Sequence, residues 1–546
     1  MFRLIRFKTM PSALRLKCGK TALVTAMAFM LSGNVSLAQA PGGVTRNAGG
    51  LPSLGDNSEL AAAEERRIGD RIAASIYRDP DYMDDPVLFD YVQGIWQPLL
   101  AAARARGDIT AELDERFAWE LFLIRDRSIN AFALPGGYLG VHLGLIGVVS
   151  NRDELAAVLG HELSHVSQRH ISRLISQQAR QAPWMIGAMI LGALAASKNP
   201  QAASALMSGG QAVAAQSQLN FSRDMEREAD RVGTGIMLDA GFDARGVVGM
   251  FEKLQQAGRL NDSGGFAYLR THPLSTERIG DAQARQQLAA PIAAAATKPG
   301  AETAQQAAWQ HAMMSARARV LGDPGVDVLR AMSAEAQRIT ANSSAAGAVV
   351  DARSVGALYA GVLAALKSRD FKTSQAYADR LRTALSSQAP DSQVGKTLAL
   401  LQLEIALDAG TVPLDAAQMD ISKPSSRAAL LLQSRALLAA GKPKDVASRL
   451  SAWVADHPKD SAAWRLLAVA YGNQNLTARA IRADAEAQVA QLDYPAALDR
   501  LRAAQAMLRS NPASGDFMDA SIIDTRARQV DSLVKEQALQ DKIDRK

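Results

Sequence analysis

Helix pairs that recur along the second half of the chain constrain its fold more than any other feature. Residues 357–381 are predicted to form a helix, a turn at Ser368–Asp370 and a second helix, and residues 427–458 and 462–488 repeat this plan. The period is about 34 residues. Because one pair cannot bury its apolar face alone, successive pairs are expected to stack into an α-solenoid.

The last of these units carries the large and small positions of a tetratricopeptide repeat: Trp464, Leu467, Ala468, Tyr471 and Ala480. Pro458 lies where such a repeat closes. The signal is clearest over residues 427–490, and an irregular helical bundle is the alternative. We predict a helical domain of tetratricopeptide-like repeats over residues 309–546.

The first half of the chain alternates between helical and extended patterns. The expected elements are a helical region over 61–106, a strand over 117–126, a hairpin or edge strand over 128–146, and helices over 152–181 and 223–240. Gly241 is a plausible helix stop. These patterns predict a mainly α domain with a small β-sheet over residues 59–286.

The N-terminus has the pattern of a secretory signal peptide over residues 1–40. A basic, acid-free start precedes the apolar run 21–33, and Ala38 and Ala40 fit the small-residue positions of a cleavage site. We predict cleavage after Ala40 and export to a bacterial periplasm, with an uncleaved anchor as the alternative. Residues 41–58 are rich in Gly, Pro and Ser and are predicted to be a flexible segment.

Charge and cysteine content restrict the function. The chain has 61 Lys and Arg against 55 Asp and Glu, but six of the basic residues lie in the leader, so the mature chain is formally neutral. This balance gives no argument for nucleic-acid binding. The one cysteine, Cys18, also lies in the leader. A metal site in the mature chain must therefore use His, Asp or Glu.

Two further segments interrupt the pattern. Residues 287–308 are rich in Ala and are predicted to be a linker between the two domains. Residues 183–197 are apolar but too short to span a membrane. We interpret the latter as a packed helical hairpin or a lid, and peripheral membrane contact is the alternative.

The sequence "HELSH" places a metal-binding pattern inside the helix predicted over 152–181. Residues four apart share a helix face, so His161 and His165 can bind one zinc ion. Glu162 lies next to them and can act on a zinc-bound water. Two surface histidines are the alternative. His170 points elsewhere on such a helix and is expected either in solvent or behind the ligands.

A catalytic zinc needs a third protein ligand, and the downstream "EREAD" supplies a candidate. Glu226 and Asp230 are four apart on one helix face, where Ala229 and Gly233 permit close packing. Glu226 is the predicted third ligand. Asp230 is expected to accept a hydrogen bond from a ligand histidine and so fix its tautomer. Glu228 points off this face and is expected in solvent.

"HELSH" and "EREAD", together with "NAFALPGGYLGV" and "RTHPLSTERI", resemble the gluzincin metallopeptidases of the CAAX-prenyl-protease superfamily. The resemblance is strongest to the soluble periplasmic branch, which joins such a domain to C-terminal tetratricopeptide repeats. It covers roughly residues 60–285 by motif and the repeats by architecture. Membrane-embedded relatives have several spans that this chain lacks beyond its leader, which argues against prenylated substrates.

The resemblance implies one Zn²⁺ per chain, with His161, His165 and Glu226 as ligands and Glu162 as the general base. It also implies that His272 can occupy the open zinc position and hold the enzyme latent. Arg278 would stabilise the oxyanion or brace the loop. The implied substrate-binding strand includes these residues: Asn130, Ala131, Phe132, Gly136 and Gly137.

The function expected from the resemblance is a periplasmic zinc endopeptidase, partly chaperone-like, that acts in quality control of outer-membrane proteins. Its expected partners are unfolded or stalled outer-membrane proteins and, through the repeats, the β-barrel assembly machinery. The alternative is a repeat scaffold with a closed or latent zinc site. Of the remaining histidines, His142 is expected to be a hydrogen-bonded strand residue, and His311 and His457 belong to no cluster.

Overall fold

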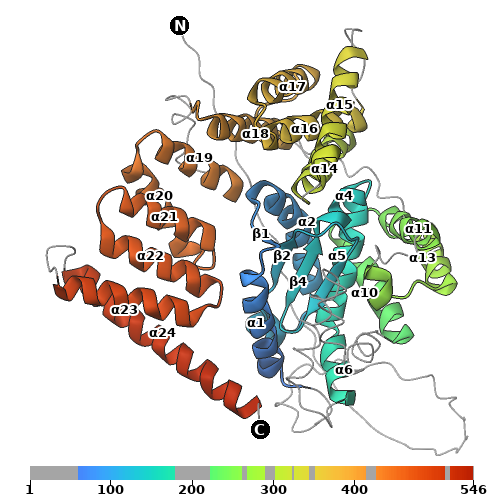
Figure 1. The fold of residues 1–546 in the computed structure, drawn as a ribbon. Coiled ribbons are helices and arrows are strands. Elements are labelled where there is room, and N and C mark those ends of the chain that lie inside the picture. The colour runs from blue at the N-terminus through green and yellow to red at the C-terminus, as the bar shows by residue number, and fades with distance from the viewer. Residues whose placement is uncertain are drawn as a thin grey trace, which may run out of the picture. The chain divides into compact units, whose positions relative to one another are not determined.

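The computed structural model describes most of the chain from residue 60 onward (Figure 1). It describes residues 60–178, 222–260, 267–288, 302–322, 325–342, 351–412, 426–510 and 517–544. The predicted signal peptide 1–40, the segment 41–58 and the apolar segment 183–197 lie outside these ranges. Within them, no helix has both the length and the apolar character needed to cross a membrane.

A four-stranded mixed sheet forms the β part of the fold. Its strands are β1 (Tyr82–Met83), β2 (Glu120–Ile124), β3 (Ala131–Leu134) and β4 (Tyr138–His142), in the order β1-β2-β4-β3. β2 and β4 are parallel, and the other pairs are antiparallel. Gly136 and Gly137 have φ of 74° and 86° in the turn between β3 and β4, a backbone region that favours glycine. The predicted hairpin is confirmed, and β3 is also an edge strand.

Helices surround this sheet in the first half of the chain. They are α1 (Ala62–Arg78), α2 (Pro86–Arg106), α3 (Ala111–Arg116), α4 (Leu143–Val148), α5 (Arg152–Ser167), α6 (His170–Gln178), α10 (Arg223–Asp239), α11 (Arg245–Leu260), α12 (Ala267–Thr271) and α13 (Thr276–Leu288). Side-chain caps explain several starts. Asp85, Asn151 and Ser222 accept hydrogen bonds from backbone N–H groups at the beginning of α2, α5 and α10.

The prediction of one helix over 152–181 is wrong. The helix breaks after Ser167, and a separate helix, α6, begins at His170. The break occurs at Arg169, whose φ of 53° is left-handed. The Arg169 guanidinium pairs at 3.0 Å with the buried Glu65 of α1 and also donates to the Leu60 carbonyl. These contacts hold a backbone conformation that is unfavourable for a non-glycine residue.

The prediction of a helix over 223–240 is confirmed by α10. Gly241 follows with φ of 86°, and its N–H donates to the Leu238 carbonyl. Phe242 N–H donates to the Met237 carbonyl, so the carbonyls of the last turn are satisfied. The predicted glycine stop is therefore found where the sequence indicates it.

The second half of the described chain is helical. Its helices are α14 (Ala304–Leu321), α15 (Val326–Asn342), α16 (Ala352–Lys367), α17 (Phe371–Ala384), α18 (Gln393–Ala409), α19 (Arg427–Ala439), α20 (Pro443–Asp456), α21 (Ser461–Gly472), α22 (Thr477–Ala490), α23 (Tyr494–Ser510) and α24 (Phe517–Asp544). From α19 to α24 each helix contacts the next (Figure 1). The three predicted helix pairs are present, and the mainly helical fold with a small sheet is confirmed.

The hydrophobic core continues from the first half of the chain into α14, α16 and α18. One buried apolar cluster includes Trp96 of α2, Leu155 of α5 and Met313 of α14. Arg317 of α14 is buried and forms ion pairs of 2.7 Å with Asp85 and 2.5 Å with Glu404. α14 therefore packs directly against the first half, and a buried charge cluster fixes that contact.

Candidate metal centre

α5 presents both histidines of "HELSH" on one buried face. His161 is 5% exposed and His165 is fully buried. Their Nε2 atoms are 3.0 Å apart. The spacing of four residues brings the rings together as predicted, and the alternative of two surface histidines is wrong.

α10 crosses α5 at very short range and carries the third candidate ligand. Gly233 of α10 faces Gly160 of α5, where a Cβ added to Gly233 would lie 2.8 Å from the Gly160 carbonyl oxygen. This backbone contact brings the Glu226 carboxylate to 3.5 Å from the Nε2 atoms of both His161 and His165. The predicted close packing of these helices is confirmed.

His272, directly after α12, completes the cluster. Its Nδ1 lies 2.9 Å from Glu226 Oε1 and 3.3 Å from His161 Nε2. One potential ligand atom from each of His161, His165, Glu226 and His272 lies within 4.8 Å of the other three. For tetrahedral zinc with bonds of about 2.0–2.1 Å, neighbouring ligand atoms lie about 3.3 Å apart. Five of the six residue pairs in this cluster bring ligand atoms to 2.9–3.5 Å of each other, close to that spacing, so the cluster fits one zinc ion.

Glu162 is the other polar group of this centre. Its side chain is fully buried, and the groups that interact with its carboxylate include the Tyr268 hydroxyl and the His272 imidazole. Its Oε1 is 3.5 Å from His272 Nε2. A buried carboxylate is costly unless hydrogen-bond donors surround it, and a zinc-bound water would supply a further donor. The carboxylate thus stands where a general base for such a water is needed.

The electrostatic environment suits a cation. Burial opposes protonation of His161, but the carboxylates of Asp230 and Glu226 raise the pKa of His161 to about 10. Burial and the positive charge of the neighbouring imidazoles lower the pKa of His165 well below its ordinary value. Burial acts to raise the pKa of Glu226, yet His272 and His161 hold it well below its ordinary range. The centre therefore favours positive charge beside an anionic Glu226.

Asp230 and Arg278 support the ligands from the side. Asp230 Oδ1 lies 3.0 Å from His161 Nδ1, the contact expected of a carboxylate that fixes a ligand tautomer. Arg278 donates to both oxygens of Asp230 at 2.6 and 2.8 Å and to the Pro273 carbonyl at 2.8 Å, and it pairs with Glu226 at 2.7 Å. These contacts favour the bracing role for Arg278 over the oxyanion role.

His170 and Glu228 lie behind the ligands, and their positions correct two expectations. Glu228 is not fully in solvent, because it accepts hydrogen bonds from His170 at 3.1 Å and Arg173 at 2.9 Å. His170 is fully buried, and its Nδ1 is 2.8 Å from His165 Nδ1. The solvent alternative for His170 is therefore wrong. That alternative assumed a continuous helix. The break at Arg169 instead places the His170 ring against His165.

Tyr268 was missed by the sequence reasoning. It is buried, and its ring stacks on His272 with centroids 4.5 Å apart. Its backbone N–H donates to the Ile129 carbonyl, just before β3. The spacing of four residues between Tyr268 and His272 is the sequence signal from which this contact could have been predicted.

The predicted substrate-binding residues lie along and beside β3. Asn130 and Ala131 are buried, and Phe132 is half-buried with its ring over Gly140. Gly136 and Gly137 lie in the turn beyond β3, and their carbonyls accept hydrogen bonds from the N–H groups of Ala118 and Glu120. These two glycines are thus engaged in the sheet.

The remaining histidines are bound within the fold or stacked. His142 Nδ1 is 2.8 Å from Ser128 Oγ, as expected of a hydrogen-bonded strand histidine. His311 is buried between Tyr91 and the Val149 carbonyl, at 2.6 and 2.9 Å. His457 is exposed and stacks on Trp453.

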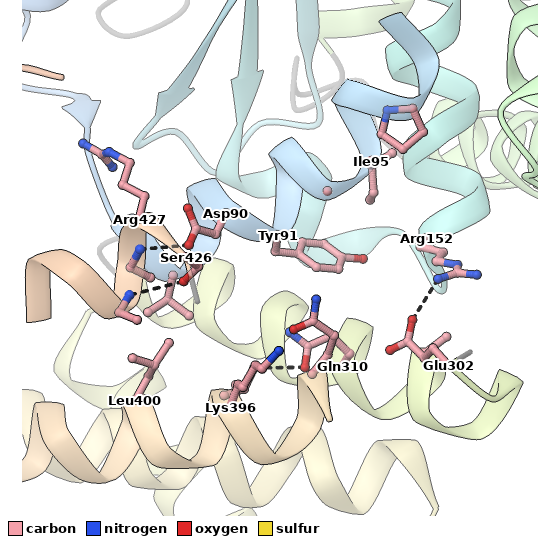
Figure 2. Close-up of a pocket in the computed structure, with 18 of the residues that line it drawn as sticks. Asp90, Tyr91, Ile95, Arg152, Glu302, Gln310, Lys396, Leu400, Ser426 and Arg427 are labelled. Carbon is pink, nitrogen blue, oxygen red and sulfur yellow. Dashed lines mark hydrogen bonds and ion pairs between the residues drawn. The ribbon is translucent and has the colours of Figure 1, made fainter. Parts of the chain in front are cut away.

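A cavity of 630 Å³ lies elsewhere, between α2, α14, α18 and α19 (Figure 2). Its walls mix apolar side chains with charged groups that pair within the protein. Arg152 bonds to Glu302 at 2.9 Å, and Asp90 accepts from the Ala428 N–H at 2.8 Å. Among the described residues, the one group with metal-site geometry is the His161 cluster, so the chemistry is assigned there.

Comparisons with known proteins agree with this geometry. Residues 97–286 match Peptidase family M48, a range that contains the whole metal cluster. The chain is 35% identical over 244 residues to a putative β-barrel assembly-enhancing protease of Vibrio cholerae, covering 44% of this chain and 48% of that protein.

Two further similarities extend this result. The β-barrel assembly-enhancing protease of Escherichia coli is 32% identical over 272 residues, covering 49% of this chain and 52% of that protein. The mitochondrial metalloendopeptidase OMA1 of Schizosaccharomyces pombe is 36% identical over 162 residues, covering 30% of this chain and 44% of that protein. The chain spans about half the length of the curated bacterial relatives that it matches.

Proposed function

We propose that the protein is a zinc-dependent endopeptidase of peptidase family M48, whose family model matches residues 97–286. The observation that carries the proposal is the buried convergence of His161, His165 and Glu226, with the fully buried Glu162 carboxylate beside them. Zinc binding alone has no need of Glu162. Peptide hydrolysis does, because a base must take the proton of the attacking water.

His161, His165 and Glu226 would hold the zinc ion. When bound, zinc supplies a Lewis acid and lowers the pKa of its water to about 7. Glu162 accepts the proton of the attacking water on a carboxylate oxygen and then passes it to the leaving amine. Asp230 accepts from His161 Nδ1–H and thereby keeps His161 Nε2 unprotonated and directed at the metal.

The substrate backbone is proposed to pair with β3. β3 is an edge strand bonded to β4 on one side, and it contacts α5, which carries the zinc-binding histidines. An extended peptide can add to such an edge through main-chain hydrogen bonds. Asn130, Ala131 and Phe132 are the proposed contact residues. Gly136 and Gly137 have the separate role of forming the hairpin turn.

His272 is proposed to hold the enzyme latent. A fourth protein ligand closes the coordination sphere, as in structural zinc sites, so His272 must leave before a peptide is hydrolysed. The α12 segment is tied to the start of β3 through Tyr268 N–H and the Ile129 carbonyl. Substrate pairing with β3 can therefore act on the segment that carries His272.

The C-terminal helices are proposed to be a solenoid of tetratricopeptide-like repeats that recruits partners. The support is the succession of contacting helices from α19 to α24 and the repeat positions around Trp464 and Tyr471. From the names of the bacterial relatives, we propose outer-membrane proteins as substrates and the β-barrel assembly machinery as partner, in the periplasm after cleavage at Ala40. For residues 183–197 the proposal stays a packed helical hairpin or a lid, with peripheral membrane contact as the alternative.

Casein cleavage by the zinc-loaded mature protein tests the peptidase proposal. We expect slow cleavage by wild type, faster cleavage by His272→Ala, and none by Glu162→Gln in either background. His457→Ala, an exposed histidine in the second half, is the matched control and should cleave like wild type. Slower cleavage by His272→Ala would refute the latency proposal alone.

A second candidate function is a repeat scaffold with a closed zinc site. The observation that favours it is the complete set of four potential ligands, which leaves zinc no open position. In that case neither wild type nor His272→Ala would cleave casein or an unfolded outer-membrane protein, although both bind zinc. Cleavage of either substrate by His272→Ala would exclude the scaffold alternative.

A further inference from the structure

A chain of hydrogen bonds leads from the ligand His165 to the outer side of α10. His165 Nδ1 is 2.8 Å from His170 Nδ1, and His170 Nε2 is 3.1 Å from Glu228 Oε2. Glu228 also accepts from Arg173 at 2.9 Å. Both imidazoles are fully buried, so these contacts are sheltered from competing water.

This arrangement depends on the break between α5 and α6. In a continuous helix, a residue five positions after His165 is rotated by about 140° and faces away from it. The left-handed Arg169 turns the chain so that His170 packs back on His165 instead. Ion pairing of Arg169 with Glu65 holds this turn. The backbone is thus built to place His170 behind a zinc ligand.

The contacts allow one assignment of protons for a zinc-binding state. His165 Nε2 faces His161 Nε2 at 3.0 Å within the cluster and must be unprotonated to bind zinc. Its proton is then on Nδ1, which donates to His170 Nδ1. His170 carries its own proton on Nε2 and donates it to Glu228. Arg173 supplies the positive charge that keeps Glu228 an acceptor.

We propose that His170 and Glu228 are positioning residues that fix the tautomer and ring orientation of the zinc ligand His165. The inference rests on the proposed zinc peptidase function and deepens it. His161 has a carboxylate partner directly, at 3.0 Å from Asp230. His165 reaches its carboxylate through the imidazole of His170. Such partners of ligand histidines contribute about 10- to 100-fold in metal affinity or activity.

The test measures zinc affinity of the mature full chain by competition with a chromogenic chelator. We expect His170→Phe, which keeps ring bulk but removes both nitrogens, to bind zinc about 10- to 100-fold more weakly than wild type. His170→Gln can accept with its carbonyl oxygen and donate with its amide, so it should recover most of the affinity. Glu228→Gln, which removes the charge, should fall between them.

Ser172→Ala is the matched control, since Ser172 is a fully buried polar residue of α6 that bonds to Arg169. Its zinc affinity should equal that of wild type. A second measurement, the visible spectrum of the Co²⁺-loaded protein, should change in His170→Phe and stay unchanged in Ser172→Ala. A role in packing alone would leave the Co²⁺ spectrum of His170→Phe unchanged.

The outcomes distinguish a failure of the proposed role of His170 and Glu228 from a failure of the proposed peptidase function. If His170→Phe binds zinc as tightly as wild type, the proposed hydrogen-bond relay from His165 through His170 to Glu228 is wrong. It is also wrong if zinc binding is weakened equally in His170→Phe, His170→Gln and Ser172→Ala. If the wild-type chain itself binds no zinc, the proposed function fails and the relay fails with it. If wild type binds zinc and cleaves casein while His170→Phe binds zinc equally well, only the relay is wrong.

Discussion

Substitution of Gly233 by alanine tests how the metal centre is assembled. A Cβ at this position would lie 2.8 Å from the Gly160 carbonyl oxygen and 2.9 Å from His161 N. Ordinary contacts of a Cβ begin at 3.4 Å, and both neighbours are backbone atoms that cannot rotate away. The α10 helix must therefore move away from α5 by about 0.5 Å.

The size of the effect follows from this movement. Glu226 lies two turns before Gly233 on the same helix, so it moves with α10. Zinc bonds tolerate deviations of about 0.2 Å, which is less than the expected shift. Overpacking costs about 1–3 kcal/mol. If that strain is released only when α10 leaves its zinc-binding position, zinc affinity falls about 5- to 150-fold.

The assay compares zinc affinity with the thermal stability of the metal-free protein. Without zinc, α10 is free to relax, and alanine gains about 1 kcal/mol of helix propensity over glycine. We therefore expect weaker zinc binding in Gly233→Ala with no loss of metal-free stability. The control is Gly235→Ala on the same helix, whose Cβ meets the mobile guanidinium of Arg106. Unchanged zinc affinity in Gly233→Ala would refute the reasoning.

Three further predictions concern stability. Arg317→Met leaves Asp85 and Glu404 as partly buried anions without their arginine partner, so the free energy of unfolding should fall by about 3–5 kcal/mol and lower the urea midpoint; an unchanged midpoint would contradict this. Burial lowers the pKa of His311 in the folded chain. The stabilisation of the folded chain by the neutral ring is therefore fully present above the unfolded-state pKa of about 6.5, and it is lost as the pH falls below that value. The melting temperature should therefore fall more between pH 7.5 and pH 5.5 in wild type than in His311→Gln. An equal fall in both proteins would count against this role of His311. Chelator should lower the melting temperature of wild type, because zinc binds the folded chain, and should not affect a chain that lacks His165; the same shift in both would exclude this site as the cause.

The metal ligands were predictable because their signals are local. The spacing of His161 and His165 on one helix, and of Glu226 and Asp230 on another, determines which side chains share a face. Gly233 marked the point of close approach between the two helices. Helix geometry accounts for these shared faces, whereas the joining of His272 to the cluster was expected only from the resemblance to the gluzincin metallopeptidases; the structure brings all four side chains together.

The His170 relay was not predictable from the same local rules. The sequence around Arg169 has no glycine or proline to signal a break, so helix periodicity continued past it. The break is stabilised by Glu65, which lies 104 residues away along the chain. The contacts of His170 and Glu228 depend on that turn. A local pattern could therefore not show that both residues lie behind His165.

The packing of α14 against the first half of the chain was also beyond local reasoning. Arg317 is in a helix predicted to belong to the repeat domain, yet its partners are Asp85 at the start of α2 and Glu404 of α18. Buried arginines are rare unless paired, and the pairs arise only in the folded chain. Similarly, no local sequence pattern predicts that His311 lies between Tyr91 and Val149.

Anomalous diffraction at the zinc edge from crystals of the zinc-loaded protein tests the central claim most directly. We predict one peak per chain, about 2.0–2.2 Å from the nearest ligand atoms of His161, His165, Glu226 and His272. Glu162 should lie beside the metal without binding it. A zinc-loaded crystal with no peak among these side chains, or with its zinc bound by other residues, would contradict the proposal that this chain is a zinc peptidase.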